Sequence, residues 1–110
     1  MPCWRNWKIV ADKLQLTSGQ LSTVLDILHR IVPDREVQVF GSRARGQAKP
    51  YSDLDLVVMG DAPLSLGTLS LLSEAFAESD LPWRVDVVDW ANTSAEFRHH
   101  IASHSLPLNH

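Results

Sequence analysis

Cysteine and basic residues are both scarce in this sequence, and each scarcity excludes a class of protein. The chain of 110 residues has one cysteine, Cys3, so it cannot form an internal disulfide, and nothing indicates an oxidising compartment. Ten Lys and Arg stand against 13 Asp and Glu, which gives a formal net charge of -3. Proteins that hold nucleic acid through its backbone usually carry a basic excess. Direct nucleic-acid binding is therefore not expected, and a small anion held through metal, or another protein, is a more suitable partner.

Long apolar runs are also missing. The segment from Met1 to Val10 lacks the uninterrupted apolar stretch of a signal peptide, and no segment approaches the length that crosses a bilayer. We therefore expect a cytoplasmic protein without membrane contact. Hydrophobic residues make up 45% and charged residues 21%, an ordinary balance for one globular domain with one core.

The sequence divides into an N-terminal arm, residues 1–16, and a domain, residues 17–110. Trp4 and Trp7 in the arm are expected to pack loosely on the domain or on a partner. Within the domain, capping signals and hydrophobic periodicity alternate between helix and strand. The first predicted element is a helix that begins after the capping box Thr17/Gln20 and ends before Pro33. Two strands follow, at 36–40 and 54–59, and then a helix after Ser65 and a strand at 83–90. A second capping box, Thr93/Glu96, predicts a short last helix, and the tail at 105–110 is expected to be non-helical.

This order predicts an α/β (α+β) fold, a small mixed sheet with helices packed on one face. The other face is expected to stay open, and the functional residues are expected to lie on it.

Two aspartates at the start of the second predicted strand indicate a metal site. Asp53 and Asp55 are two residues apart, so their side chains point to the same face of the strand. Carboxylates this close repel each other unless a cation lies between them. Hard oxygen ligands suit Mg²⁺, which completes its shell with water and phosphate.

A phosphate site is predicted just before this pair. Gly41 and Ser42 lie where a strand gives way to a helical turn, whose exposed N–H groups bind phosphate oxygens. Glycine allows the backbone to approach a ligand closely, and the Ser42 hydroxyl adds a donor. Arg43 and Arg45 are near enough to meet a triphosphate with forked hydrogen bonds, although Arg43 could equally be a solvated charge.

Asp86 is the candidate for a third carboxylate. It lies in an apolar predicted strand, where a charge is costly unless it is used or paired. If Val85 and Val87 face the helices, alternation places Asp86 on the open face with Asp53 and Asp55. There it could bind a second metal ion and act as general base for an incoming hydroxyl. Asp89 has the opposite parity and is expected to cap the strand end.

These motifs together resemble the DNA polymerase β-like nucleotidyltransferase superfamily, and most closely its minimal nucleotidyltransferase (MNT) domains. The resemblance spans about residues 17–108 and rests on Gly41–Gly46, on Ser52–Asp55 and on the strand around Asp86. It implies a polymerase β-like palm fold and two-metal transfer of NMP from an NTP. In that scheme Asp53, Asp55 and Asp86 bind two Mg²⁺ ions, and Gly41 and Ser42 bind phosphate.

The same resemblance implies a partner. MNT proteins are often encoded beside a small helical HEPN-domain protein, and in characterised pairs the MNT antitoxin transfers AMP from ATP to a tyrosine of the HEPN toxin. A hetero-oligomer of this kind is therefore possible here. Two alternatives stay open: a non-catalytic antitoxin that acts by binding, and a nucleotidyltransferase subunit that works with a separate substrate-binding protein on a small molecule. The residues themselves do not choose among ATP, GTP, CTP and UTP.

Three further residues could contact a metal ion or a base but are better explained by packing or by helix electrostatics. His100 and His104 are four apart on a predicted helix, as in a zinc pair, but a polar face near a helix C-terminus is favoured. Tyr51 could stack on a base, yet a loop tyrosine commonly only packs. Phe40 is expected in the core.

Overall fold

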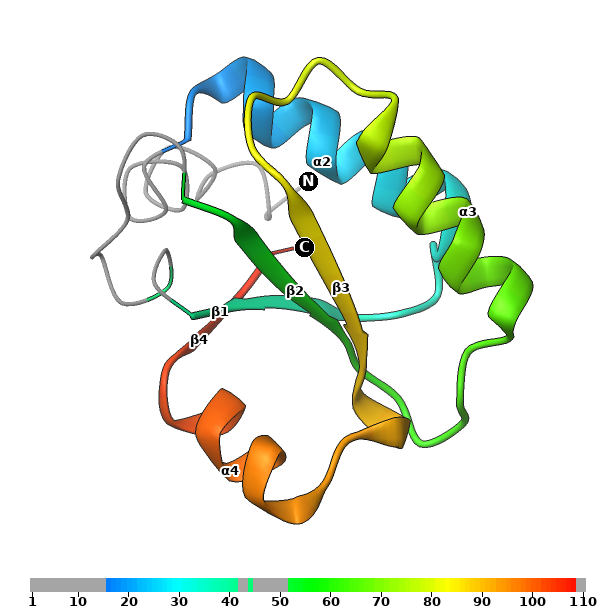
Figure 1. The fold of residues 1–110 in the computed structure, drawn as a ribbon, viewed down its shortest axis with the longest axis vertical. Helices are drawn as coiled ribbons and strands as arrows, with labels where there is room; N and C mark the ends of the chain where they lie inside the picture. The colour runs from blue at the N-terminus through cyan, green and yellow to red at the C-terminus, as the bar shows by residue number, and fades with distance from the viewer. Residues whose placement is uncertain (1–15, 42–43, 45–51, 109–110) are drawn as a thin grey trace.

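The computed structural model describes residues 16–41, 44 and 52–108, and the chain in these ranges folds as a four-stranded sheet with three α-helices (Figure 1). In chain order the elements are α2 (Ser18–Ile31), β1 (Val37–Phe40), β2 (Leu54–Val58), α3 (Leu66–Ala77), β3 (Val85–Asp89), the 3-10 turn η2 (Trp90–Asn92), α4 (Ala95–Ser103) and β4 (Ser105–Pro107). The predicted arm lies outside the described residues except for Leu16, which is buried in the core. None of the described helices is long and apolar enough to cross a membrane.

Helix α2 begins and packs as its sequence predicts. The Thr17 side chain accepts a hydrogen bond from the Gln20 backbone N–H at 3.1 Å, and the Gln20 side chain accepts one from the Thr17 N–H at 3.0 Å. This capping box satisfies two of the N–H groups that a helix start leaves without partners. The apolar residues at helical spacing then form one buried stripe, which consists of Leu21, Val24, Ile27 and Leu28.

The sheet has the strand order β3-β2-β1-β4. β1 pairs antiparallel with β2 and with β4, whereas β2 pairs parallel with β3, so the sheet is mixed as predicted. The strand β4 lies in the tail that was predicted only to be non-helical. It pairs with β1 over three residues and contains Pro107, which suits the edge of a sheet because proline lacks the N–H that an interior position needs.

Two helices cover one face of the sheet. Val37, Val39, Leu54, Leu56 and Val58 are fully buried against α2 and α3, which lie side by side on one side of the strands in Figure 1. The predicted fold class is thus confirmed, and this layer holds the main core.

The other face is not wholly open, which differs from the expectation. Phe40 and Val57 alternate to this face and pack with Ile101 of α4 in a second, smaller core. The Phe97 ring also meets the Phe40 ring edge to face, with centroids 5.8 Å apart. Because two large apolar side chains project from this face, the chain covers them with its last helix, and only the part of the face around the aspartates is left.

The N-cap of α4 also differs from the prediction. The side chain of Ser94, not Thr93, accepts the first hydrogen bond, from the Phe97 N–H at 3.1 Å. The Thr93 hydroxyl instead donates to the Trp90 carbonyl at 2.7 Å and accepts from Arg98 at 3.0 Å. The sequence pattern did not predict the turn η2. Because the Thr93 side chain bonds to this turn and to Arg98, the N-cap of α4 lies one residue later, at Ser94.

Candidate active site

Asp55 and Asp86 lie side by side across the sheet. Their Cα positions are register partners in the parallel pair β2–β3, and Phe40 is the partner of Asp55 on its other side, in β1. Directly opposed residues of neighbouring strands project to the same face. The two carboxylates therefore share the face that carries Phe40, as the alternation predicted, and they occupy the part of it beyond the α4 contact.

The electrostatics of Asp55 reflect this crowding. Burial of the half-buried side chain, together with the negative charges of Asp86 and Asp53, raises the pKa of the Asp55 carboxyl above its ordinary value. Asp53 itself is exposed at the entrance to β2. A bound cation would stabilise the ionised form of this carboxylate, because its positive charge offsets both the cost of burial and the repulsion from the neighbouring carboxylates.

Asp86 has a weak counterion within the chain. Arg84 places a guanidinium nitrogen 3.5 Å from the Asp86 carboxylate, and the two side chains are 79% and 46% exposed. An ion pair this exposed contributes at most about 1 kcal/mol. A metal ion or an incoming hydroxyl can therefore take the place of Arg84 at little cost. The sequence reading missed Arg84, although its position two residues before Asp86 gives it the same strand parity.

Gly41 brings the end of β1 against the Asp55 carboxylate. Its φ is +80°, a backbone conformation that side chains disfavour, and a Cβ added there would clash with the Asp55 carboxylate. Two features of the structure therefore require glycine at position 41: the left-handed backbone and the close approach to the Asp55 carboxylate. The other predicted phosphate-binding residues, Ser42, Arg43 and Arg45, lie outside the described residues, as does Tyr51.

The acidic side chains suit a cation that arrives with its own ligands. In the described ranges, no group of three or more His, Cys, Asp or Glu side chains is arranged as a ready-made metal site, and this includes His100 and His104. Mg²⁺ rarely uses such an all-protein cage, and usually takes one or two carboxylates plus water and substrate phosphates. Asp55 and Asp86, which are register partners, therefore fit Mg²⁺ as a pair of ligands that water and phosphate oxygens would complete.

The family is shown by comparison with known proteins. The model of the nucleotidyltransferase domain family matches residues 21–106, a span that includes β1, Asp53, Asp55 and Asp86. The chain belongs to this family. It is a nucleotidyltransferase-domain protein, and its chemistry is transfer of a nucleotidyl group.

One curated relative strengthens this assignment, and solved structures match the fold. A Haemophilus influenzae protein named "Probable protein adenylyltransferase MntA" is 52% identical over 86 residues, which cover 78% of this chain and 75% of that protein. A crystal structure of a toxin-antitoxin with AMP-PNP superposes with a TM-score of 0.68 at 24% identity, over 80% of this chain and 71% of that one.

A second structure, a tri-AMPylated Shewanella oneidensis HEPN toxin in complex with MNT antitoxin, matches with a TM-score of 0.62 at 21% identity, over 80% of this chain and 67% of that one. At these identities the two structures show a shared fold. The nucleotidyltransferase domain described here therefore has the architecture seen in MNT antitoxins.

Proposed function

We propose that this nucleotidyltransferase transfers AMP from ATP to a hydroxyl of a partner protein, a tyrosine of a HEPN toxin, and so acts as the antitoxin of a toxin-antitoxin pair. The relative at 52% identity bears the name of a protein adenylyltransferase. Two solved structures with the same fold are of toxin-antitoxin complexes, one with AMP-PNP and one with an AMPylated HEPN toxin. These names support ATP as the proposed donor and a HEPN-domain protein as the proposed partner. We propose that the reaction takes place in the cytoplasm.

The observation that carries this proposal is the row formed by Asp86, Asp55 and the end of β1. Asp55 is the register partner of Asp86 on one side and of Phe40 on the other, and Gly41 follows Phe40 directly. A donor phosphate at Gly41 would therefore lie beside Asp55, with Asp86 on the far side. In this proposal the nucleotide lies on the β1 side of Asp55 and the acceptor on the β3 side, on one face of the sheet.

In the proposed reaction, the acceptor oxygen forms a bond to the α-phosphorus of ATP while the bond from that phosphorus to the bridging oxygen breaks. Pyrophosphate leaves with the electron pair of the broken bond, and the acceptor proton passes to the Asp86 carboxylate. Backbone N–H groups after Gly41 and the Ser42 hydroxyl hold the phosphates, with Arg43 and Arg45 beside them. Asp53, Asp55 and Asp86 would hold two Mg²⁺ ions, which supply charge stabilisation and lower the pKa of the acceptor hydroxyl.

Transfer of label provides the direct test. The protein is incubated with α-labelled ATP, Mg²⁺ and its proposed HEPN-domain partner, in parallel with Asp53→Ala and Asp55→Ala. We expect label on the HEPN protein with the wild-type chain and none with either variant. No label in any reaction, or equal label in all three, contradicts the proposal.

The non-catalytic alternative makes a different prediction in cells. If the chain protects only by docking to the toxin, Asp53→Asn must neutralise the toxin as well as the wild type does. We expect the variant to fail, because the proposed protection requires covalent modification. Transfer to a small hydroxylated molecule in place of the HEPN protein would instead favour the two-subunit alternative.

A further inference from the structure

The ring of Phe97 is an exposed aromatic surface on α4. Phe97 lies in the first turn of this helix and is 37% exposed. Three other aromatic rings in the described ranges are almost fully buried, those of Phe40, Phe76 and Trp83. The half-buried ring of Trp90 has the Arg98 guanidinium over it, 5.0 Å from the ring centroid. Among these rings, the Phe97 ring is therefore the one that a flat ligand can reach.

His100 extends this surface. Its imidazole ring stacks beside the Phe97 ring, with centroids 6.3 Å apart and planes 11° apart, and the His100 side chain is exposed. The two residues are three positions apart on α4, so their side chains lie on the same side of the helix. Because the planes are nearly parallel, the two rings present their faces in the same direction. We call Phe97 and His100 the α4 ring pair.

The α4 ring pair lies on the same side of the sheet as Asp55. The Phe97 ring contacts the Phe40 ring edge to face, with centroids 5.8 Å apart. Phe40 in turn is the register partner of Asp55 and directly precedes Gly41. Figure 1 shows α4 on the side of the strands away from α2 and α3. A single side chain, that of Phe40, therefore links the ring pair to the row of carboxylates.

The proposed reaction limits where the nucleoside can lie. In-line displacement places the acceptor and the leaving pyrophosphate on opposite sides of the α-phosphorus, which are the β3 side and the β1 side of Asp55. The nucleoside must then extend along the strand or away from the face. Val57, the next residue of β2 on this face, is fully buried in the small core beneath α4. A nucleoside that extends from Asp55 along β2 therefore meets α4, where the ring pair is exposed.

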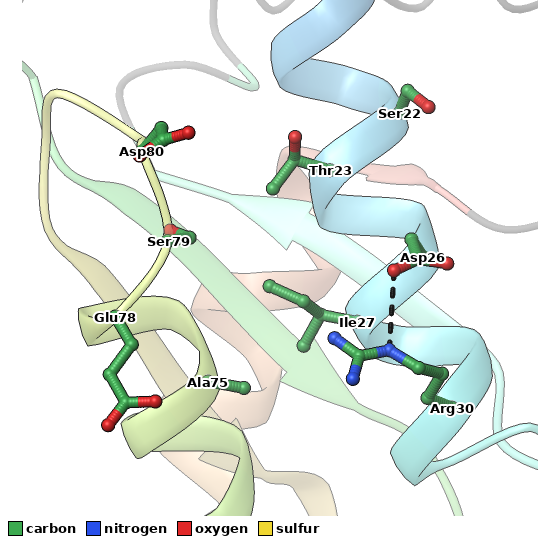
Figure 2. A pocket seen from close by; sticks show the side chains of 9 residues that line it. All are labelled: Ser22, Thr23, Asp26, Ile27, Arg30, Ala75, Glu78, Ser79 and Asp80. Carbon is green, nitrogen blue, oxygen red and sulfur yellow. Dashed lines mark ion pairs between the residues drawn. The ribbon is translucent and has the colours of Figure 1, made fainter.

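Two hollows among the described residues are less suited to a base. Figure 2 shows the α2–α3 groove, of about 560 Å³, whose nine labelled lining residues include no aromatic side chain. Its two helices cover the face of the sheet opposite to Asp55. The other hollow, of about 500 Å³, lies between α3 and the edge of β3, and its two rings, Phe76 and Trp83, are almost fully buried. Neither hollow offers an exposed ring beside the carboxylates.

We propose that the base of the donor nucleotide, adenine in the proposed reaction, stacks on the α4 ring pair while its phosphates are held at Gly41. This inference rests on the proposed function, because it assigns the base subsite of the same nucleotide site. Stacking on an aromatic side chain stabilises a bound base and tolerates any base, since every base has a π-face. The ring pair thus adds affinity for a nucleotide without reading the hydrogen-bonding edge of its base.

Two ligands that differ in the nucleoside test the ring pair without turnover. α,β-Methylene-ATP, which cannot release pyrophosphate, and tripolyphosphate are each titrated with Mg²⁺ into the full chain by isothermal titration calorimetry. We expect the wild type to bind the ATP analogue more tightly. Phe97→Ala should reduce this preference by about fivefold or more, the effect of losing one base–aromatic stack, and leave the Kd of tripolyphosphate unchanged. Phe97→Leu, which keeps an apolar contact with Phe40, serves if the alanine variant does not fold.

His100→Ala and His99→Ala form a matched pair. Both histidines are exposed on α4, and His100 is the one of the two whose ring stacks on Phe97. We expect His100→Ala to lose part of the preference for the ATP analogue and His99→Ala to keep it. Equal effects of the two histidine substitutions, an unchanged preference in the Phe97 variants, or a wild type that binds both ligands equally overturn the assignment.

Label transfer distinguishes failure of the base subsite from failure of the proposed function. If the wild type transfers label to the HEPN protein but the Phe97 variants keep the full preference for the ATP analogue, the base subsite is wrong and the proposed function stands. If the preference depends on Phe97 but the wild type transfers no label, the proposed function is contradicted, and the ring pair is supported as part of a nucleotide-binding site.

Discussion

Asp55 and Asp86 are register partners in the one parallel strand pair among the described residues, so two carboxylates project side by side from neighbouring strands. Like charges in this arrangement destabilise the fold unless a ligand compensates them. The repulsion between Asp55 and Asp86 should therefore affect both the stability of the protein and its binding of cations, and both effects can be measured.

The first prediction concerns pH and the stability of the protein without metal. The raised pKa of Asp55 means that the folded state binds its proton more tightly than the unfolded state. Stability is therefore lost as pH rises from about 3.9, the ordinary value for aspartate, to the raised pKa of Asp55 in the folded state. Asp55→Asn should remove this loss, so that the variant is more stable than the wild type at neutral pH. Urea unfolding over a pH series without divalent cations measures it, and equal pH slopes in the two proteins contradict it.

The second prediction concerns binding of metal and nucleotide. Mg²⁺ with ATP should stabilise the wild type, by about 2.7 kcal/mol at a concentration one hundred times the Kd. Asp53→Asn and Asp55→Asn should lose most of that gain, because each removes a proposed metal ligand. Thermal unfolding with and without Mg²⁺ and ATP provides the measurement. Ser22→Trp, at an exposed position of α2, is the control that keeps the gain. A full gain in both aspartate variants shows that these carboxylates hold no metal.

The third prediction concerns Gly41. An alanine there must adopt a φ of +80° and place its Cβ against the Asp55 carboxylate. Gly41→Ala should cost about 1–2 kcal/mol for the left-handed backbone alone, and it should also abolish transfer by displacing Asp55. Chemical unfolding and the label-transfer assay measure the two effects.

Gly19→Ala is the matched control for this substitution. Gly19 lies in α2, its added Cβ would come no closer than 4.0 Å to the nearest atom, and no positive φ applies. Alanine favours helix, so this change should be neutral or stabilising by up to about 1 kcal/mol. If both glycine variants behave alike, the special role of Gly41 is disproved.

The fourth prediction separates Asp86 from the nucleotide side. Asp86→Asn should lower the rate of transfer by about 10²–10⁴, the usual contribution of a general base, and keep a measurable part of the ATP-linked rise in Tm. It should also lower the pKa of Asp55, because one of the charges that raises it is gone. Rapid-quench measurement of label transfer tests the rate. A variant with wild-type rate excludes Asp86 as the base.

Arg84 has a more limited structural role in this scheme. Because its ion pair with Asp86 is largely exposed, Arg84→Ala should change the free energy of unfolding by less than about 1 kcal/mol. Urea unfolding checks this value, and a larger loss would show that the pair is a significant part of the fold.

Local signals in the sequence predicted most of the elements correctly. The capping box at Thr17 and Gln20, the cap at Ser65 and the apolar periodicity of the strands all depend on residues within one or two turns of each other. β4 was not predicted, because three residues containing a proline carry no strand pattern, and only pairing with β1 makes them a strand. The cap of α4 was misplaced by one residue, because the turn η2 uses Thr93 for its own hydrogen bonds.

The sequence by itself determined which residues carry charge, which alternate to the same face, and where a glycine precedes a pair of aspartates. The parity of Asp53, Asp55 and Asp86 follows from the two-residue period of a strand, which needs no knowledge of the neighbours. Only the tertiary structure decided that Asp55 is the partner of Asp86, that Gly41 touches Asp55, and that α4 covers Phe40. These facts depend on strand order and register, which are set by how distant segments pack together and so cannot be read from any local stretch.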